Sequence, residues 1–179
     1  TIRLYPYKYQ KEMGVPPIDR GMLMCYNVGD VNNPDGINSI FNLAEIRKYL
    51  SGEINYPLEL DYALPVFSWA ALYHNKELVN VFGSWVVKNE SYFKLSARQP
   101  TDPSIRNYDV IEEYSVSESV FQKGDIVKLE SIDYADLKEL TAELGAKNKN
   151  KKPRVILYRL DENQLIEDHK HVQAIFNIF

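Results

Sequence analysis

The sequence predicts an α/β protein: the C-terminal half of a TIM-type barrel, with about four βα units and an antiparallel β insertion. Three observations support this prediction. Continuous apolar runs are typical of strands buried in a parallel sheet, helix-period patterns follow the last three runs, and short strand-like segments precede the second of these helices. The strand-like runs cover residues 1–6, 21–27, 60–69 and 154–161.

The composition sets limits on the class of protein. Of the 179 residues, 45% are apolar, which is enough for a packed core. The net charge of −4 does not favour nucleic-acid binding. A single cysteine, Cys25, excludes an intrachain disulfide and any zinc site built from several cysteines. No apolar stretch approaches ~18 residues, so no membrane span is predicted.

The first run, Thr1 to Tyr5, predicts a strand that starts at the first residue given. It has no methionine start and no signal-peptide pattern. A half barrel also has two unpaired edges. We therefore expect a segment before Thr1, or a second chain, to complete the barrel. The alternative is a short edge strand at a true N-terminus.

The second and third runs carry local signals of their own. After the second run, Asn42 and Glu45 form a capping box that predicts a helix ending near Leu50. Pro65 lies inside the third run and predicts a bulge or bend, since proline cannot donate a hydrogen bond within a sheet.

The interval 75–130 breaks the alternation of strands and helices. Its strand-like segments are short and separated by polar residues, and Gly83-Ser84 predicts a hairpin turn. We expect an antiparallel insertion here, within a single domain that covers residues 1–179. Because the βα rhythm is otherwise regular, an open doubly wound sheet is the competing fold.

The last part of the chain returns to the βα pattern. Asp133 is expected to cap a helix over residues 134–144, and Gly145 to end it. The final strand precedes an apolar stripe that predicts a closing helix over residues 165–179.

Both folds bind ligands at the C-terminal ends of their strands, where an aromatic ring offers a flat surface on which a sugar can stack. Each candidate there also has a structural alternative. The structural alternative is an ion pair for Arg3, capping of a loop for Asn27, and packing in a core for Trp69. Asp161 is in a position to cap the final helix. The candidate ligand-binding residues are Arg3, Tyr26, Asn27, Trp69, Arg159 and Asp161.

Several kinds of site receive no support from the sequence. There is no glycine-rich phosphate loop and no Gly-x-Ser-x-Gly motif, so no cofactor is predicted. The histidines do not share a helix face, so no metal site is predicted. Cys25 is predicted to be a small buried residue. Asp19 and Arg20 are predicted to form a structural ion pair.

Two segments, 14–27 and 58–69, resemble a group of uncharacterised bacterial proteins with a glycoside-hydrolase-like barrel that are secreted or lipid-anchored. More distantly, residues 24–27 (Met-Cys-Tyr-Asn) resemble the Met-x-Tyr-Asp of chitinase-like glycoside hydrolases. The resemblance implies a carbohydrate ligand, an extracytoplasmic location, and strands five to eight of the barrel for this chain. Asn27 departs from the family pattern, and the family's catalytic acid belongs to strand four, upstream of Thr1.

Three hypotheses about function remain open at the level of the sequence. The first is a glycoside-hydrolase-like barrel that acts on carbohydrate, or descends from enzymes that do, with its catalytic acid outside this chain. The second is a non-catalytic glycan-binding or cell-surface scaffold protein, slightly favoured by Asn27 because an amide cannot serve as an acid. The third is a self-contained α/β domain with another role.

Overall fold

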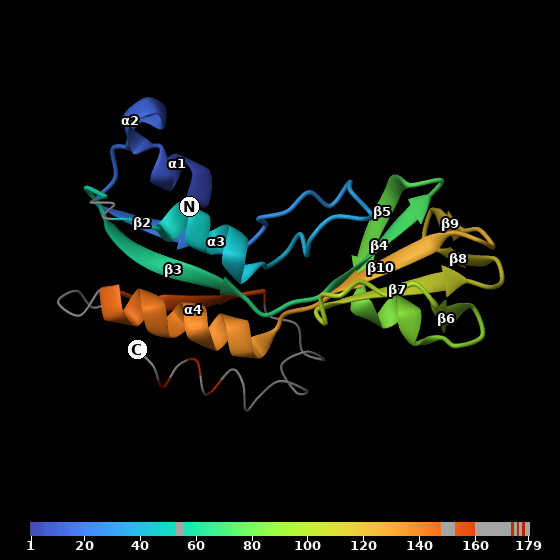
Figure 1. Cartoon of the computed structure of the whole chain (residues 1–179). Helices are drawn as coiled ribbons and strands as arrows, with labels where there is room; N and C mark the ends of the chain where they lie inside the picture. The colour runs from blue at the N-terminus through green and yellow to red at the C-terminus, as the bar shows by residue number, and fades with distance from the viewer. Residues whose placement is uncertain (53–55, 148–152, 160–172, 174, 176, 178–179) are drawn as a thin grey trace. The chain divides into compact units, whose positions relative to one another are not determined.

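The computed structural model describes residues 1–52, 56–147, 153–159, 173, 175 and 177. The contacts divide the chain into two compact units, which are treated separately below (Figure 1). Unit 1 comprises Thr1–Val28, Phe41–Phe67 and Asp133–Phe179, and unit 2 comprises Gly29–Ile40 and Ser68–Ile132. The closing helix predicted over residues 165–179 falls almost entirely outside the described residues.

Unit 1 is built on a parallel sheet of four strands in the order β1-β2-β3-β11. Leu23, in the middle of β2, lies opposite Ile2 on one side and Tyr62 on the other, and all three are buried. This agrees with the apolar runs in the sequence, since strands in a parallel sheet are covered on both faces. The strands are β1 (Ile2–Arg3), β2 (Arg20–Met24), β3 (Glu59–Pro65) and β11 (Val155–Tyr158).

The longer helices of unit 1 begin where the sequence predicts. Asn42 caps α3, because its side-chain oxygen accepts a hydrogen bond from the Glu45 backbone N–H at 3.0 Å. Asp133 precedes α4 and accepts from the Ala135 N–H at 2.8 Å. Gly145 does not end α4, so that prediction is wrong. The helices are α1 (Leu4–Lys8), α2 (Gln10–Met13), α3 (Leu43–Leu50) and α4 (Tyr134–Lys147).

A buried carboxylate, Asp61, joins three neighbouring strands of this sheet. Arg20 on β2 donates to it from Nη2 at 2.6 Å and from Nε at 2.8 Å. Arg154, next to β11, donates from its backbone N at 2.8 Å and from Nη2 at 2.9 Å. The side chain of Asp61 is 4% exposed, so these bonds replace its hydration. The expected pairing of Arg20 with Asp19 is therefore corrected to a pairing with Asp61.

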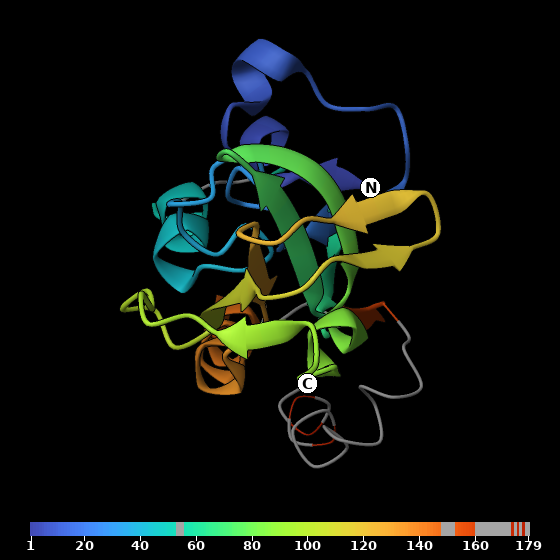
Figure 2. The ribbon, with the colours of Figure 1, turned by 90° about the vertical axis from the view of Figure 1, so that its right-hand side faces the viewer.

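Unit 2 contains an antiparallel five-stranded sheet in the order β5-β4-β10-β7-β6. One face of this sheet packs Ala70, Leu72 and Val127 against Phe93 and Phe121 in an apolar core. Figure 2 shows the separate β8–β9 hairpin in yellow. The elements are β4 (Trp69–His74), β5 (Glu77–Gly83), η1 (Ser84–Lys88), β6 (Phe93–Leu95), β7 (Ile105–Val110), β8 (Tyr114–Val116), β9 (Ser119–Phe121) and β10 (Ile126–Glu130).

The predicted hairpin turn at Gly83-Ser84 is not present, and β4 and β5 are joined by an earlier turn. Asn75 and Lys76 connect β4 to β5, and both have positive φ angles, 49° and 70°. Two successive residues of this kind form the turn that matches the twist of a two-residue hairpin. Gly83 instead ends β5, and Ser84 begins the 3-10 helix η1.

The prediction of half a TIM-type barrel is wrong. A barrel half needs repeated βα units, whereas β3 ends at Pro65 and is followed at Trp69 by β4, which belongs to a second, antiparallel sheet. The predicted opening strand is also reduced to Ile2–Arg3, because Leu4–Lys8 turn into a helix. Apolar runs signal burial but not the direction of the partner strand, so the run 60–69, which predicts one strand, contains most of β3 and the first residue of β4. Because there is no half barrel, the prediction that a preceding segment or a second chain completes a barrel no longer has a basis.

Replacing Asp61 by Asn tests the role of this carboxylate. Its bonds to Arg20 and Arg154 hold the pKa of Asp61 well below its usual range. The ionised form therefore stabilises the fold above about pH 4, and this contribution is lost as the pH falls through the lowered pKa. We expect Asp61→Asn to reduce stability by about 1–2 kcal/mol at pH 7 and by less at pH 2–3, measured by hydrogen exchange of the β3 amides. An equal loss at both pH values would contradict this account.

Candidate functional site

Parallel strands place several of the predicted residues at one edge of the sheet in unit 1. Arg3 ends β1, Tyr26 and Asn27 follow β2, and Arg159 follows β11. The carboxyl ends of parallel strands meet at the same edge, which is the usual ligand edge of an open α/β sheet. Trp69 is not part of this edge, because it begins β4 in unit 2. Asp161 lies outside the described residues.

Three aromatic rings cluster at this carboxyl edge. Tyr26 and Tyr158 stack with their ring centroids 5.1 Å apart and their planes 6° from parallel. Phe67, just after β3, meets both rings edge-on, at 6.2 Å from Tyr26 and 5.7 Å from Tyr158. Tyr26 and Phe67 are each only 7% exposed, whereas Tyr158 is 46% exposed. The exposed ring of Tyr158 therefore rests on a buried aromatic base.

Sequence reasoning found Tyr26 but not its two partners. Phe67 lies inside an apolar run and Tyr158 near the end of another, so both read as core residues. The available signal was their position: each lies at or directly after the carboxyl end of a strand that neighbours another in the sheet. The strand order needed to use that signal was not evident from the sequence.

Burial keeps the Tyr26 hydroxyl protonated. Desolvation raises the pKa of Tyr26, and the neighbouring Tyr158 and Cys25 raise it further. Burial also raises the pKa of the Cys25 thiol to about 12, so this cysteine is an inert core residue as predicted. Tyr26 thus adds a neutral hydrogen-bond donor to the aromatic cluster.

The polar candidates at this edge face solvent. Arg3, Asn27 and Arg159 are all exposed. Arg3 is therefore not a buried charge in need of compensation, and within the described part of the chain neither arginine forms an ion pair. Asn27 has a positive φ of 56°, a conformation that asparagine tolerates better than most residues. The edge therefore presents two cations and an amide beside the aromatic cluster.

Unit 2 contains a second group of polar residues, on the sheet face opposite its apolar core. Trp69 lies directly opposite Glu130 on the neighbouring strand, and its Nε1 donates to Glu130 Oε2 at 2.8 Å. The Ser39 hydroxyl donates to the same carboxylate oxygen. Lys128 Nζ lies 2.9 Å from Glu130 Oε1 as an ion pair, although that oxygen lacks a partner with hydrogen-bond geometry. Lys128 and Glu130 are both buried.

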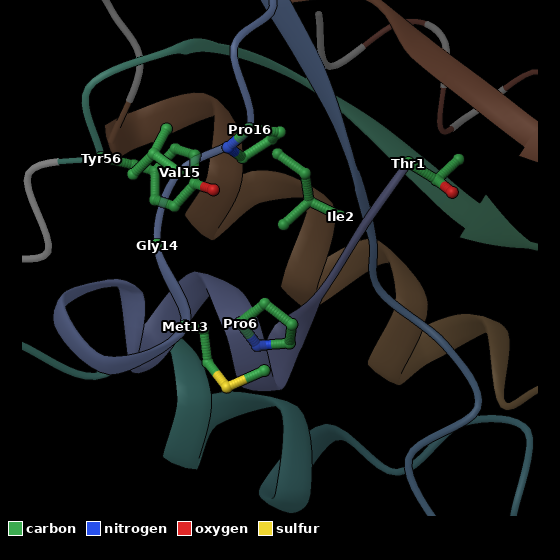
Figure 3. Close-up of a pocket in the computed structure, with 8 residues that line it drawn as sticks. All are labelled: Thr1, Ile2, Pro6, Met13, Gly14, Val15, Pro16 and Tyr56. Carbon is green, nitrogen blue, oxygen red and sulfur yellow. The ribbon is translucent and has the colours of Figure 1, made fainter.

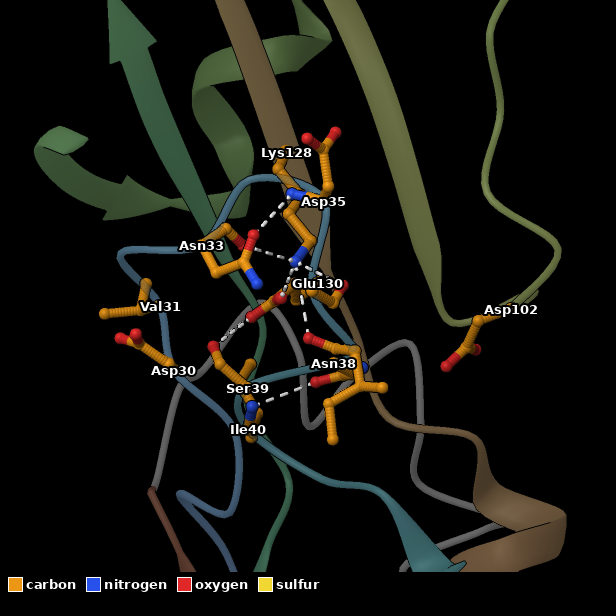
Figure 4. A network of polar contacts seen from close by, with 12 residues as sticks. Asp30, Val31, Asn33, Asp35, Asn38, Ser39, Ile40, Asp102, Lys128 and Glu130 are labelled. Atoms are coloured by element: carbon orange, nitrogen blue, oxygen red, sulfur yellow. Dashed lines mark hydrogen bonds and ion pairs between the residues drawn. The ribbon is translucent and has the colours of Figure 1, made fainter. Parts of the chain in front are cut away.

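The loop Gly29–Ile40 lies over these charges (Figure 4). Lys128 Nζ donates to the carbonyl oxygens of Gly36 at 2.9 Å and Ile37 at 3.3 Å. The Tyr73 hydroxyl donates to the Val31 carbonyl at 2.5 Å. Loops rich in Asp, Asn and Gly often surround a metal ion with oxygen atoms, and here the lysine ammonium contacts the carbonyls instead.

The group around Glu130 is consequently structural. Its carboxylate has no exposed surface, and its oxygens contact Trp69, Ser39 and Lys128. Trp69 therefore has a structural role, as the alternative to ligand binding predicts, because its indole N–H donates a hydrogen bond to a buried carboxylate. Across the described residues, no group of three or more His, Cys, Asp or Glu side chains is arranged to hold a metal ion.

The chain matches no protein-family model, and no curated protein or solved structure shows significant similarity to it. The resemblance to chitinase-like glycoside hydrolases therefore stays a prediction from the sequence. In the described part of the chain, no helix has the length and apolar character needed to cross a membrane.

Replacing Lys128 by Met tests the buried ion pair. The variant leaves Glu130 buried without its counter-charge, for which we expect a loss of about 3–5 kcal/mol in the stability of unit 2. Both tryptophans lie in this unit, so tryptophan fluorescence during urea unfolding reports on it selectively. The matched control is Lys123→Met, because the Lys123 side chain is 69% exposed and its ion pair with Glu112 lies at the surface. Equal losses for the two variants would contradict the structural role of Lys128.

Proposed function

We propose that this protein binds glycans without cleaving them, with a sugar ring stacked on Tyr158 at the carboxyl edge of the parallel sheet. The observation that carries the proposal is the half-exposed ring of Tyr158, whose inner face lies flat on the buried ring of Tyr26. A ring fixed in this way offers its outer face to a ligand and loses little conformational freedom when the ligand binds.

The surroundings of Tyr158 suit a polyhydroxylated ligand. The apolar face of a sugar packs on an aromatic ring, while its hydroxyl groups need hydrogen-bond partners around the rim. The exposed side chains of Arg3, Asn27 and Arg159 supply donors at the same edge of the sheet. The resemblance of residues 24–27 to chitinase-like glycoside hydrolases supports the same class of ligand. The resemblance of segments 14–27 and 58–69 to secreted or lipid-anchored bacterial proteins supports an extracytoplasmic location.

Binding is favoured over hydrolysis by the residue types at this edge. Glycoside hydrolysis uses two carboxyl groups, or one carboxyl and an assisting group of the substrate. The described residues that directly follow β2, β3 and β11, namely 25–28, 66–67 and 159, include no Asp or Glu, and Asp161 lies outside the described residues. At position 27, where the chitinase-like pattern has an acid, this chain carries an amide.

The proposal is tested by titrating the protein with chitotetraose, cellotetraose and mannotetraose in a calorimeter. We expect at least one of them to bind, and Tyr158→Ala to weaken that binding about tenfold, because the stacking surface is removed. Tyr158→Phe retains the ring and is expected to bind within about twofold of the unaltered protein, because the stacking surface is kept.

The control for this experiment is Trp85→Ala, because Trp85 is an aromatic residue of similar exposure, 53%, and lies on η1 in unit 2. It should leave the affinity unchanged. The proposal fails if no oligosaccharide binds, or if Tyr158→Ala and Trp85→Ala behave alike. Turnover of a chromogenic β-glycoside by this chain would disprove its non-catalytic part.

A further inference from the structure

A pocket of 330 Å³ opens in unit 1 beside α1 and the segment that follows α2 (Figure 3). This volume lies at the lower end of the range typical of small-molecule sites, about 300–1,000 Å³. The pocket is separate from the three aromatic rings of the carboxyl edge, none of which lines it. Its lining consists of Thr1, Ile2, Pro6, Met13, Gly14, Val15, Pro16 and Tyr56.

The walls of the pocket are mostly aliphatic and carry no charged side chain. Ile2 forms a fixed wall, because its side chain packs over Gly21, where a Cβ atom would lie only 2.5 Å from Ile2 Cδ1. Met13 and Val15 are 55% and 36% exposed and form the outer rim. Such a lining favours an uncharged, largely apolar ligand, since it offers no charged side chain as a counter-charge.

Tyr56 brings a polar atom to this apolar pocket. The residue is only 6% exposed, and its hydroxyl is buried without a hydrogen-bond partner among the described residues. A buried hydroxyl without a partner destabilises the folded state, so a ligand that supplies an acceptor recovers part of that free energy. Burial also raises the pKa of Tyr56, so the hydroxyl stays protonated and acts as a donor at neutral pH.

We propose that this pocket binds a small uncharged molecule, largely apolar, with one carbonyl oxygen that accepts a hydrogen bond from Tyr56. The aliphatic walls hold the apolar part, and the carbonyl oxygen accepts the hydrogen bond that the Tyr56 hydroxyl does not otherwise make. The site is independent of the glycan proposal, because it shares no residue with the carboxyl edge.

The test uses two fluorinated probes of nearly the same shape, observed by ¹⁹F NMR with the full chain. One is 4-fluoroacetophenone, and the other is 1-ethyl-4-fluorobenzene, which lacks the carbonyl. For probes of this size, we expect the ketone to bind with a Kd on the order of 1 mM and the hydrocarbon several-fold more weakly. Tyr56→Phe should weaken ketone binding about fivefold and leave hydrocarbon binding unchanged or stronger.

Two further variants complete the design. Tyr5→Phe removes a hydroxyl from an exposed tyrosine outside the pocket and should change neither affinity. Val15→Phe adds bulk at the exposed rim and should block both probes, which keeps the proposal testable if Tyr56→Phe does not fold. The proposal is overturned if the two probes bind equally well, if Val15→Phe binds both normally, or if neither probe binds at its solubility limit.

Discussion

The buried carboxylate of Asp61 is the interaction on which unit 1 depends. It receives hydrogen bonds from Arg20 on β2 and from Arg154 beside β11, so one side chain on β3 links its own strand to both neighbours. These bonds lie near the amino ends of the strands and agree with the register that brings the opposite ends together. The stacked rings of Tyr26 and Tyr158 are a consequence of that register. A structural charge at one end of the sheet thus supports the candidate binding surface at the other.

Unit 2 satisfies its buried charges in a different way. Lys128 and Glu130 lie two residues apart on β10 and project from the same face of the sheet, where a polar loop covers them. The ammonium contacts backbone carbonyls, and the carboxylate accepts from Trp69 and Ser39. A buried pair of this kind adds little net stability compared with apolar residues, but removing one partner is costly. The pair thereby holds the loop on this face of the sheet, since carbonyl oxygens of the loop contact Lys128 and the Ser39 hydroxyl donates to Glu130.

The two proposed sites of unit 1 rely on opposite uses of tyrosine. At the carboxyl edge, Tyr158 exposes its ring, and the buried Tyr26 supports it from below. In the pocket, Tyr56 buries both its ring and its hydroxyl, so that the unpaired polar atom becomes the attractive group. The first arrangement suits a flat, hydrated ligand, and the second suits a small apolar one. The chemistry of a tyrosine site is therefore decided by which part of the side chain is withdrawn from water.

The sequence by itself determined part of the local structure. The Asn42 and Asp133 caps, the apolar runs that became β2 and β3, and the burial of Cys25 follow from patterns a few residues long. It also placed Tyr26 and Asn27 after a strand, where ligands usually bind. The tertiary structure decided which strands pair and in which direction, and this turned the expected half barrel into a parallel and an antiparallel sheet. It also brought together Asp61 with Arg154, Glu130 with Trp69, and Tyr26 with Tyr158, which are 93, 61 and 132 residues apart. No local pattern encodes such pairs, because strand pairing depends on long-range contacts rather than on the periodicity of one segment.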